Sequence, residues 1–126
     1  MRKTFIDTLC QLAAADERIW LLTGDLGFNV LEKFKEQFPK RFVNVGVAEQ
    51  NMCGVAAGLA LTGKIVFTYS IANFSTLRAL EQIRNDLCYH KASVIIVTVG
   101  GGLTYGKAGY THYGVEDLGI IHCLPE

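Results

Sequence analysis

The sequence predicts an α/β domain of three layers (α/β/α), with helices on both faces of a mostly parallel sheet. Four short apolar runs, rich in β-branched and aromatic residues, are typical of buried strands: residues 19–23, 41–45, 65–69 and 94–99. Segments with apolar residues at helical spacing separate these runs, and such alternation favours a parallel sheet. With 126 residues, half of them apolar, we expect one domain spanning residues 1–126.

The helices are placed by their apolar spacing and by the residues that end them. The spacing predicts a helix over residues 2–16 and a short one over residues 31–38, closed by Pro39. A third covers about residues 48–62 and ends at Gly63, a favoured C-cap. We expect Asn73 to cap the fourth helix, whose core stripe comprises Leu77, Leu80, Ile83 and Leu87. A long loop over residues 100–114 precedes a last short helix over residues 116–121.

The composition excludes several classes of function. Twelve basic residues balance twelve acidic ones, which gives no electrostatic reason to expect nucleic acid or an acidic membrane surface as a partner. The four cysteines are widely separated and the three histidines are not clustered, so neither a zinc site nor a redox motif is predicted. No apolar run approaches the roughly 20 residues of a membrane span, and Asp7 interrupts the N-terminal apolar run that a signal peptide needs. We therefore expect a cytoplasmic protein without metal ligands of its own.

Glu49 is the central candidate for a functional side chain. It lies in the first turn of the third predicted helix, shortly after a strand that stops at Gly46. In open α/β sheets, ligands bind at the carboxyl ends of the strands. An acid at a helix start also stabilises the helix dipole by up to ~1 kcal/mol without any ligand, and the local pattern leaves this alternative open. On the same helix, Gly54, Ala57 and Gly58 allow either the close approach of another chain or tight packing on the helix's own sheet.

Three stretches of this chain, residues 46–52, 54–64 and 70–74, resemble the pyrimidine-binding domain of transketolases, specifically the split type whose halves are separate subunits. The resemblance extends from Gly24 to His112. It implies that Glu49 faces N1′ of the aminopyrimidine of thiamine diphosphate and promotes its imino tautomer, which is acid–base catalysis through the cofactor. It also implies the thiamine diphosphate-binding fold, and that residues 1–126 lack the family's last strand and helix.

The resemblance assigns further residues to the cofactor and the substrate. It implies that Asp25 lines the site near the cofactor, that Phe74 stacks on the aminopyrimidine, and that Ile71 and Leu77 replace two aromatic residues around it. His112 ends a Gly-Tyr-Thr-His segment similar to the family's Gly-Pro-Thr-His, and would act as a catalytic residue that contacts the donor substrate. From local pattern alone, Asp25 is equally a turn aspartate, Phe74 a core aromatic and His112 an exposed histidine.

Two other positions bear on the substrate. Arg78, on the fourth predicted helix, can reach a substrate phosphate or carboxylate, although a solvated arginine is the commoner outcome. Some family members carry an aspartate four residues before the histidine, where this chain has Ala108. This difference leaves the recognition of the donor's hydroxyl groups open.

A motif for magnesium and diphosphate is not found. Gly24-Asp25 followed by Gln50-Asn51 mimics the Gly-Asp-Gly…Asn motif, but Leu26 replaces its third glycine and the further oxygen ligands that magnesium needs are missing. The resemblance therefore implies an N-terminal transketolase-like partner subunit that holds the magnesium ion and the diphosphate. The assembly would be a homo-oligomer or a heterotetramer with two copies of each subunit.

The expected function is that of the pyrimidine-binding component of a transketolase-like enzyme, which transfers a two-carbon ketol unit between ketose and aldose sugars. One alternative is a non-catalytic, truncated module that binds a partner. Another is a component of a different thiamine diphosphate enzyme, similar to deoxyxylulose phosphate synthase or to the β-subunit of 2-oxo acid dehydrogenases. The presence of Glu49, Phe74 and His112 together favours the enzyme component.

Overall fold

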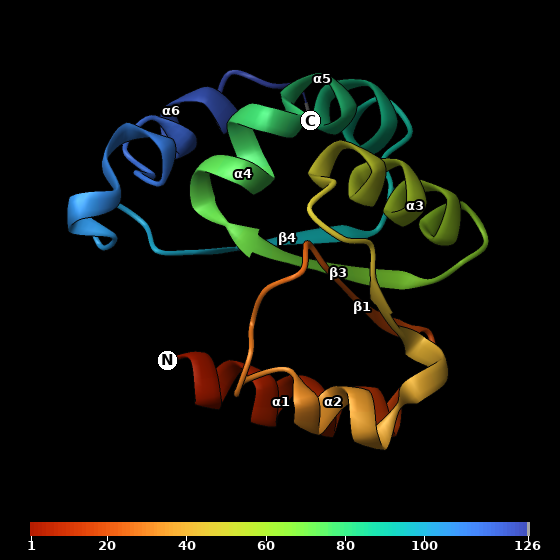
Figure 1. The fold of residues 1–126 in the computed structure, drawn as a ribbon. Coiled ribbons are helices and arrows are strands. Elements are labelled where there is room, and N and C mark those ends of the chain that lie inside the picture. Colours follow the sequence, from red (N-terminus) through yellow and green to blue (C-terminus); the bar gives the residue numbers. More distant parts are fainter. Residues whose placement is uncertain (126) are drawn as a thin grey trace.

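The computed structural model describes residues 1–125. Its strands form one four-stranded parallel sheet, and Figure 1 labels three of them, β1, β3 and β4. The strands are β1 (Ile19–Thr23), β2 (Phe42–Asn44), β3 (Ile65–Ile71) and β4 (Val94–Val99). Their order across the sheet is β2-β1-β3-β4. All three neighbouring pairs are parallel, so the carboxyl ends of the strands lie along one edge. The predicted fold class and all four predicted strands are confirmed.

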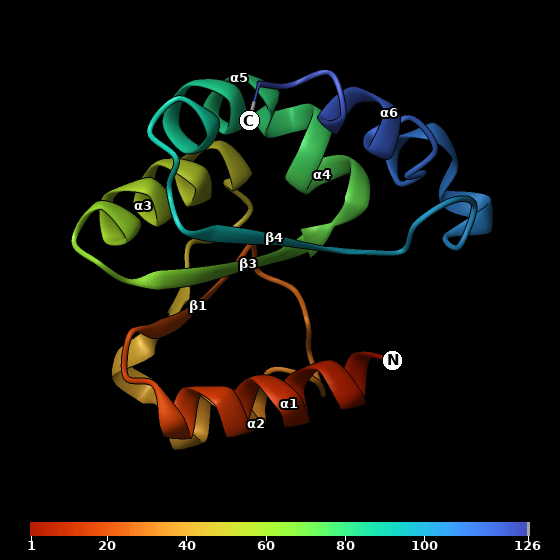
Figure 2. The ribbon, with the colours of Figure 1, turned by 180° about the vertical axis from the view of Figure 1, so that it is seen from behind.

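Helices cover both faces of the sheet, which completes the three predicted layers (Figures 1 and 2). Helices α1 (Arg2–Ala15) and α2 (Glu32–Gln37) lie on one face. The opposite face carries α3 (Glu49–Leu61), α4 (Ala72–Thr76), α5 (Leu80–Gln82) and α6 (Asp117–Ile121). Among residues 1–125, no helix combines the length and apolar character that crossing a membrane requires.

The core consists of an apolar cluster on each face of the sheet and a third beneath the α5 region. Residues of α1, α2, β1 and β3 form the first, including Leu9, Leu21, Phe34 and Tyr69. On the other face, Met52 and Ala56 of α3 pack against Leu22 and Val66 of the sheet. The third contains Cys53, Ala57, Ala79, Ile83 and Leu87. Because both faces are buried, the strands have nearly continuous apolar sequences rather than alternating ones.

The fourth predicted helix differs from the expectation in two ways. It is broken into α4, a 3₁₀ turn (Leu77–Ala79), α5 and a π-helical turn (Ile83–Cys88). Of the predicted core stripe, Ile83 and Leu87 are buried, whereas Leu77 is exposed. The expected cap is also wrong, because the helix begins at Ala72 and the Asn73 side chain donates to the Thr111 carbonyl at 2.7 Å. A tertiary hydrogen bond thus takes the polar group that the local pattern assigns to capping.

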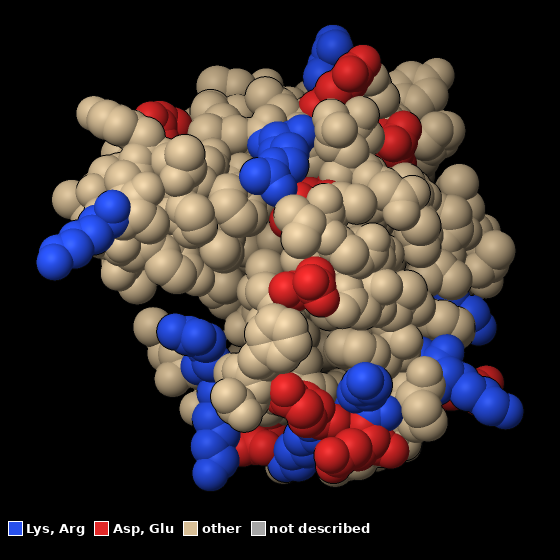
Figure 3. Space-filling view, in the orientation of Figure 1, with Lys and Arg blue, Asp and Glu red and all other residues tan. Residues whose placement is uncertain are grey.

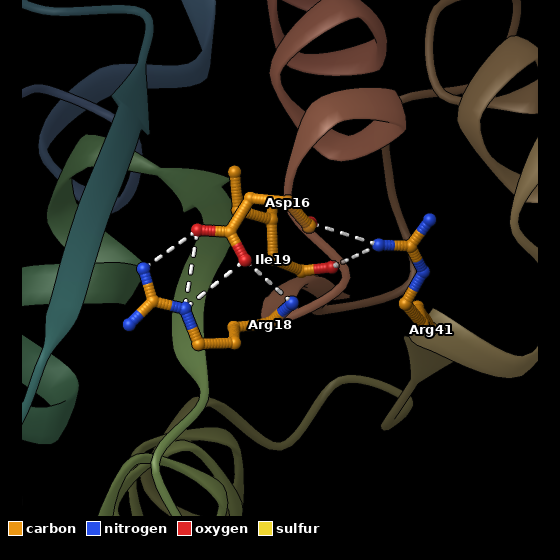
Figure 4. Close-up of polar contacts among 4 residues, drawn as sticks. All are labelled: Asp16, Arg18, Ile19 and Arg41. Atoms are coloured by element: carbon orange, nitrogen blue, oxygen red, sulfur yellow. Dashed lines mark hydrogen bonds and ion pairs between the residues drawn. The ribbon is translucent and has the colours of Figure 1, made fainter.

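Arg41 fixes the end of α1 against β1 and β2 (Figure 4). Its guanidinium donates to the carbonyl oxygens of Ala13 at 3.0 Å and Asp16 at 3.1 Å, at the end of the helix where carbonyls lack partners within the helix. The same figure shows Asp16 hydrogen-bonded to the side chain and backbone of Arg18. These contacts hold the first helix-to-strand turn, and so the position of β1 in the sheet.

Gly54 and Gly58 lie on the outer face of α3. Both are exposed, and a β-carbon added at either would meet nothing within 4 Å, whereas Ala57 faces the core. The interpretation that these two glycines allow tight packing on their own sheet is therefore wrong. The other interpretation, that they leave room for another chain, stays a prediction.

Candidate active site

The candidate site lies at the carboxyl ends of the two central strands, β1 and β3. The register pairs Thr23 with Tyr69, so the next residues along each strand, Gly24 and Ser70, are neighbours. Helix α3 begins directly above them with Glu49, and α4 begins where β3 ends. Three segments far apart in the sequence therefore meet at one point of the sheet edge.

The carboxylate of Glu49 is fully buried, with none of its side chain exposed. Its Oε1 accepts a hydrogen bond from the Ser70 hydroxyl at 2.9 Å, and its Oε2 accepts one from Nη1 of Arg78 at 2.8 Å. A buried carboxylate is costly unless it is paired and hydrogen-bonded. An acid that served only the helix dipole would need no burial, so dipole stabilisation alone does not explain this arrangement.

Gly24 closes the wall on the Oε1 side of the carboxylate. A β-carbon at this position would lie 2.9 Å from Oε1 of Glu49 and 3.3 Å from Oγ of Ser70. Only a residue without a side chain therefore lets the strand pass so close to the acid. Oε1 is enclosed by Gly24 and Ser70, and Oε2 is left as the oxygen that another group can approach.

Phe74 and His112 lie side by side, although they are 38 residues apart in the sequence. Their ring centroids are 5.0 Å apart in an edge-on arrangement, and the ring of Tyr105 lies 5.6 Å from the His112 ring, also edge-on. The Thr111 hydroxyl is 2.8 Å from Nδ1 of His112. These contacts leave His112 half-buried, so the interpretation as a merely exposed loop histidine is wrong.

Asp25 is exposed at the same edge of the sheet and has an unusual backbone conformation, with φ of 58°. Such positive φ values are uncommon for residues other than glycine and cost free energy unless other contacts hold them. Asn44 supplies these contacts: its amide donates to Oδ1 of Asp25 at 2.8 Å, and its Oδ1 accepts from the Asp25 backbone N–H at 3.1 Å. Asp25 is therefore held in a defined position by the end of β2.

The sequence alone did not predict the contacts of three residues in this region, namely Ser70, Asn44 and Gly24. Gly24 and Ser70 are neighbours because of the register of β1 and β3. The side chain of Asn44 connects the end of β2 to Asp25, in the turn after β1. The only available signal was a small or polar residue at the carboxyl end of a predicted strand. Such residues are also common in ordinary turns.

The remaining predicted site residues have the following positions. Ile71 is the last residue of β3 and is half-buried, and Leu77 is 38% exposed on the 3₁₀ turn after Phe74. The Arg78 side chain is partly exposed, and its guanidinium is paired with the carboxylate of Glu49. The roles of Ile71 and Leu77 around a bound ring, and of Arg78 and His112 toward a substrate, stay predictions.

Within residues 1–125, no group of three or more His, Cys, Asp or Glu side chains is arranged to hold a metal ion. The polar groups joined at Glu49 are its buried carboxylate, the hydroxyl of Ser70 and the guanidinium of Arg78. Beside them lies the aromatic ring of Phe74, whose face can stack on a flat ligand. This donor set fits a flat heterocycle with in-plane nitrogens better than a metal or a diphosphate.

These features define an α/β domain whose candidate site lies at the carboxyl edge of a parallel sheet, where ligands bind in such folds. All 126 residues match the family model described as "Transketolase, pyrimidine binding domain", and the chain belongs to this family. The resemblance to the transketolase pyrimidine-binding domain, inferred from residues 46–52, 54–64 and 70–74, is confirmed.

The chain is similar to subunits of several transketolases. It is 42% identical over 125 residues to a subunit of the apulose-4-phosphate transketolase of Phocaeicola vulgatus, covering 98% of this chain and 40% of that protein. It is 40% identical over 126 residues to a 6-deoxy-6-sulfo-D-fructose transketolase subunit of Clostridium sp., covering 99% of this chain and 39% of that protein. The chain thus spans about two fifths of the length of these relatives.

Solved structures agree with this assignment. A structure described as "Split gene transketolase, inactive beta4 tetramer" matches with a TM-score of 0.85 and 39% identity, over 98% of this chain and 40% of that one. A transketolase mutant from Pichia stipitis matches with a TM-score of 0.83 over 98% of this chain and 20% of that one. At 19% identity, the second match supports the fold alone.

Proposed function

We propose that this chain is the pyrimidine-binding component of a transketolase-like enzyme that transfers a two-carbon ketol unit between a ketose and an aldose. The observation that carries the proposal is the buried carboxylate of Glu49, which shares the guanidinium of Arg78 with the ring of Phe74, on a chain of the transketolase pyrimidine-binding family. Relatives named as transketolase subunits support the reaction class. The cysteines are free and scattered, which agrees with the cytoplasmic location that we include in the proposal.

The residues present fit the aminopyrimidine end of thiamine diphosphate. Glu49 would hold N1′ through Oε2, and Phe74 would stack on the ring. When bound, the cofactor supplies the carbanion chemistry that ketol transfer requires. The chain contributes a buried carboxylate fixed by Ser70, where it can hold or release a proton at one defined atom. His112, half-buried and in contact with the rings of Phe74 and Tyr105, would face the donor substrate.

The proposal includes a partner subunit that binds the diphosphate and magnesium. Several apolar side chains are exposed around the carboxyl edge of the sheet, namely Phe28, Val47, Leu77, Leu103, Tyr110 and Leu118. Figure 3 shows charged side chains gathered over α1 and α2, while much of the opposite helical layer in this view is uncharged. Such a surface is typical of a protein interface. The similar β4 tetramer is described as inactive, which agrees with a need for a second type of subunit.

The test compares Glu49→Gln with wild type in the complex of this chain and its diphosphate-binding partner. Glutamine keeps the size of the side chain but cannot carry the charge that stabilises a protonated N1′. We expect the rate of deuterium exchange at C2 of bound cofactor to fall ~10²–10⁴-fold. Glu81→Gln, at an exposed acid on α5, is the matched control and should leave the rate unchanged. Wild-type exchange in Glu49→Gln with the cofactor still bound would refute the proposal.

The isolated chain provides a second measurement. Since no group of three or more His, Cys, Asp or Glu side chains among residues 1–125 is arranged to bind a metal ion, the proposal expects no tight binding of thiamine diphosphate and magnesium without the partner. Isothermal titration calorimetry of the chain alone measures this directly. A dissociation constant in the micromolar range or below would contradict a site shared between two subunits.

A further inference from the structure

Arg78 makes two contacts at once in the candidate site. Its Nη1 donates to Oε2 of Glu49 at 2.8 Å, and its Cζ lies 4.1 Å from the centroid of the Phe74 ring. The second distance is well inside the range of a cation–π contact. Glu49 and Phe74 are the two groups that the proposed function assigns to the aminopyrimidine ring, so Arg78 occupies both of the contacts that this ring needs.

The guanidinium and the aminopyrimidine share the chemistry that makes this possible. Both are flat, both stack on an aromatic face, and both present in-plane nitrogen atoms to a carboxylate. Oε1 of Glu49 is bound to Ser70 and enclosed by Gly24, where even a β-carbon would come within 2.9 Å. The approach to the carboxylate is therefore through Oε2, and one flat group at a time can lie between this oxygen and the Phe74 ring.

We propose that Arg78 is a stand-in for the aminopyrimidine, which pairs with Glu49 and covers Phe74 in the unloaded chain and leaves when the cofactor enters. The inference rests on the proposed function, because it takes Glu49 and Phe74 as the ring's contacts. In the unloaded chain the guanidinium compensates a buried charge that would otherwise favour rearrangement of the pocket. The site is thereby kept in its binding geometry before the cofactor arrives.

The exposed fractions of the two side chains indicate that Arg78, and not Glu49, is the partner that leaves the ion pair. The Glu49 side chain is fully buried and fixed by Ser70, whereas 41% of the Arg78 side chain is exposed. Arg78 lies on the 3₁₀ turn between two short helices, and its long side chain can rotate into solvent at little cost in desolvation. Cofactor binding must then break the ion pair, and part of the cofactor's binding free energy is used to displace the arginine.

The experiment measures the dissociation constant of thiamine diphosphate at saturating magnesium, in the complex of this chain with its diphosphate-binding partner. Arg78→Met keeps the length of the side chain but removes its charge and its donors. We expect the variant to bind the cofactor about tenfold more tightly, the scale of one charge-assisted hydrogen bond that no longer has to be broken. Arg84→Met, at an exposed arginine on the π-helical turn, is the matched control and should leave the constant unchanged.

The alternatives predict results of a different kind. If Arg78 is instead a permanent contact of the cofactor, Arg78→Met binds it more weakly, and this outcome overturns the inference. An unchanged dissociation constant with a raised KM for a phosphorylated donor also overturns it and makes Arg78 a substrate ligand.

If Arg78→Met does not fold, Arg78→Lys replaces it, since lysine keeps the charge but not the flat stacking group. Tightening of about two- to threefold is expected for Arg78→Lys, because its single-point contact is weaker than the arginine's, and no change or weakening overturns the inference.

The experiments distinguish failure of the proposed function from failure of the inference about Arg78. If the wild-type complex binds no thiamine diphosphate, the proposed function is wrong and the inference falls with it. If the wild-type complex binds the cofactor and Glu49→Gln loses exchange, but Arg78→Met does not tighten binding, only the stand-in role is wrong.

Discussion

Gly24→Ala tests whether the wall around Glu49 is as tight as the structure shows. The new β-carbon would lie 2.9 Å from Oε1 and 3.4 Å from Cδ of Glu49, and 3.3 Å from Oγ of Ser70. The carboxylate has little room to yield, because it is held by Ser70 on one oxygen and by Arg78 on the other. Overpacking of this kind costs ~1–3 kcal/mol, and a lengthened hydrogen bond to a buried charge adds ~1 kcal/mol. We expect the free energy of unfolding to fall by about 2–4 kcal/mol.

The assay is equilibrium unfolding in urea, with Gly54→Ala as the matched control. Gly54 lies on the exposed face of α3, where an added β-carbon meets nothing within 4 Å. Alanine is favoured over glycine within a helix by ~1 kcal/mol, so the control should be more stable than wild type. The same methyl group thus acts in opposite directions at the two sites. A change below about 0.5 kcal/mol for Gly24→Ala would refute the tight wall around the carboxylate.

Two further predictions concern the end of α1. Arg41→Ala removes the hydrogen bonds to the Ala13 and Asp16 carbonyls and should lower the free energy of unfolding, measured in urea, by ~1–2 kcal/mol. The control is Lys40→Ala, at the exposed neighbouring residue, which should change the free energy of unfolding by less than ~0.5 kcal/mol. Equal losses of stability in the two variants would contradict the capping role of Arg41. The side-chain and backbone hydrogen bonds from Arg18 lower the pKa of Asp16 from 3.8 to about 2, so the stability this carboxylate contributes is present above about pH 4 and is lost as the pH falls toward 2. Asp16→Asn should therefore lose less stability than wild type between about pH 4 and pH 2 when urea midpoints are compared, and parallel pH profiles would rule this linkage out.

Much of the fold could be predicted because it depends on local patterns. The apolar runs of the four strands reflect burial on both faces, and the glycine that closes α3 reflects a C-cap. The position of Glu49 followed from the same logic, since a helix that starts after a parallel strand places its first turn at the ligand-binding edge. The family resemblance added predicted roles for Phe74 and His112, and these roles remain predictions because local pattern alone leaves both residues open between a site and ordinary packing.

The interior of the site could not be predicted, because its contacts depend on register and on side-chain competition between distant segments. The hydrogen bond from Ser70 to Glu49 spans 21 positions and depends on how α3 packs on β3, while the register of β1 and β3 brings Gly24 beside the same hydroxyl. Asn73 shows the competition directly: it fits the pattern of a helix cap, but the Thr111 carbonyl takes its amide. Neither outcome is encoded in the residues next to the group that makes the contact.

The ion pair of Glu49 and Arg78 shows why a residue's own pattern can mislead about its role. On its helical segment, Arg78 has the pattern of a solvated side chain, and its exposed fraction of 41% agrees with that. Its position is nevertheless determined by an acid 29 residues away, because a buried carboxylate requires a counter-charge and a guanidinium can also stack on the adjacent ring. A ligand that offers the same carboxylate a flat, nitrogen-bearing ring competes for the same space. The strength of the unloaded contact and the affinity for the ligand are therefore linked, and a substitution at Arg78 changes both in opposite directions.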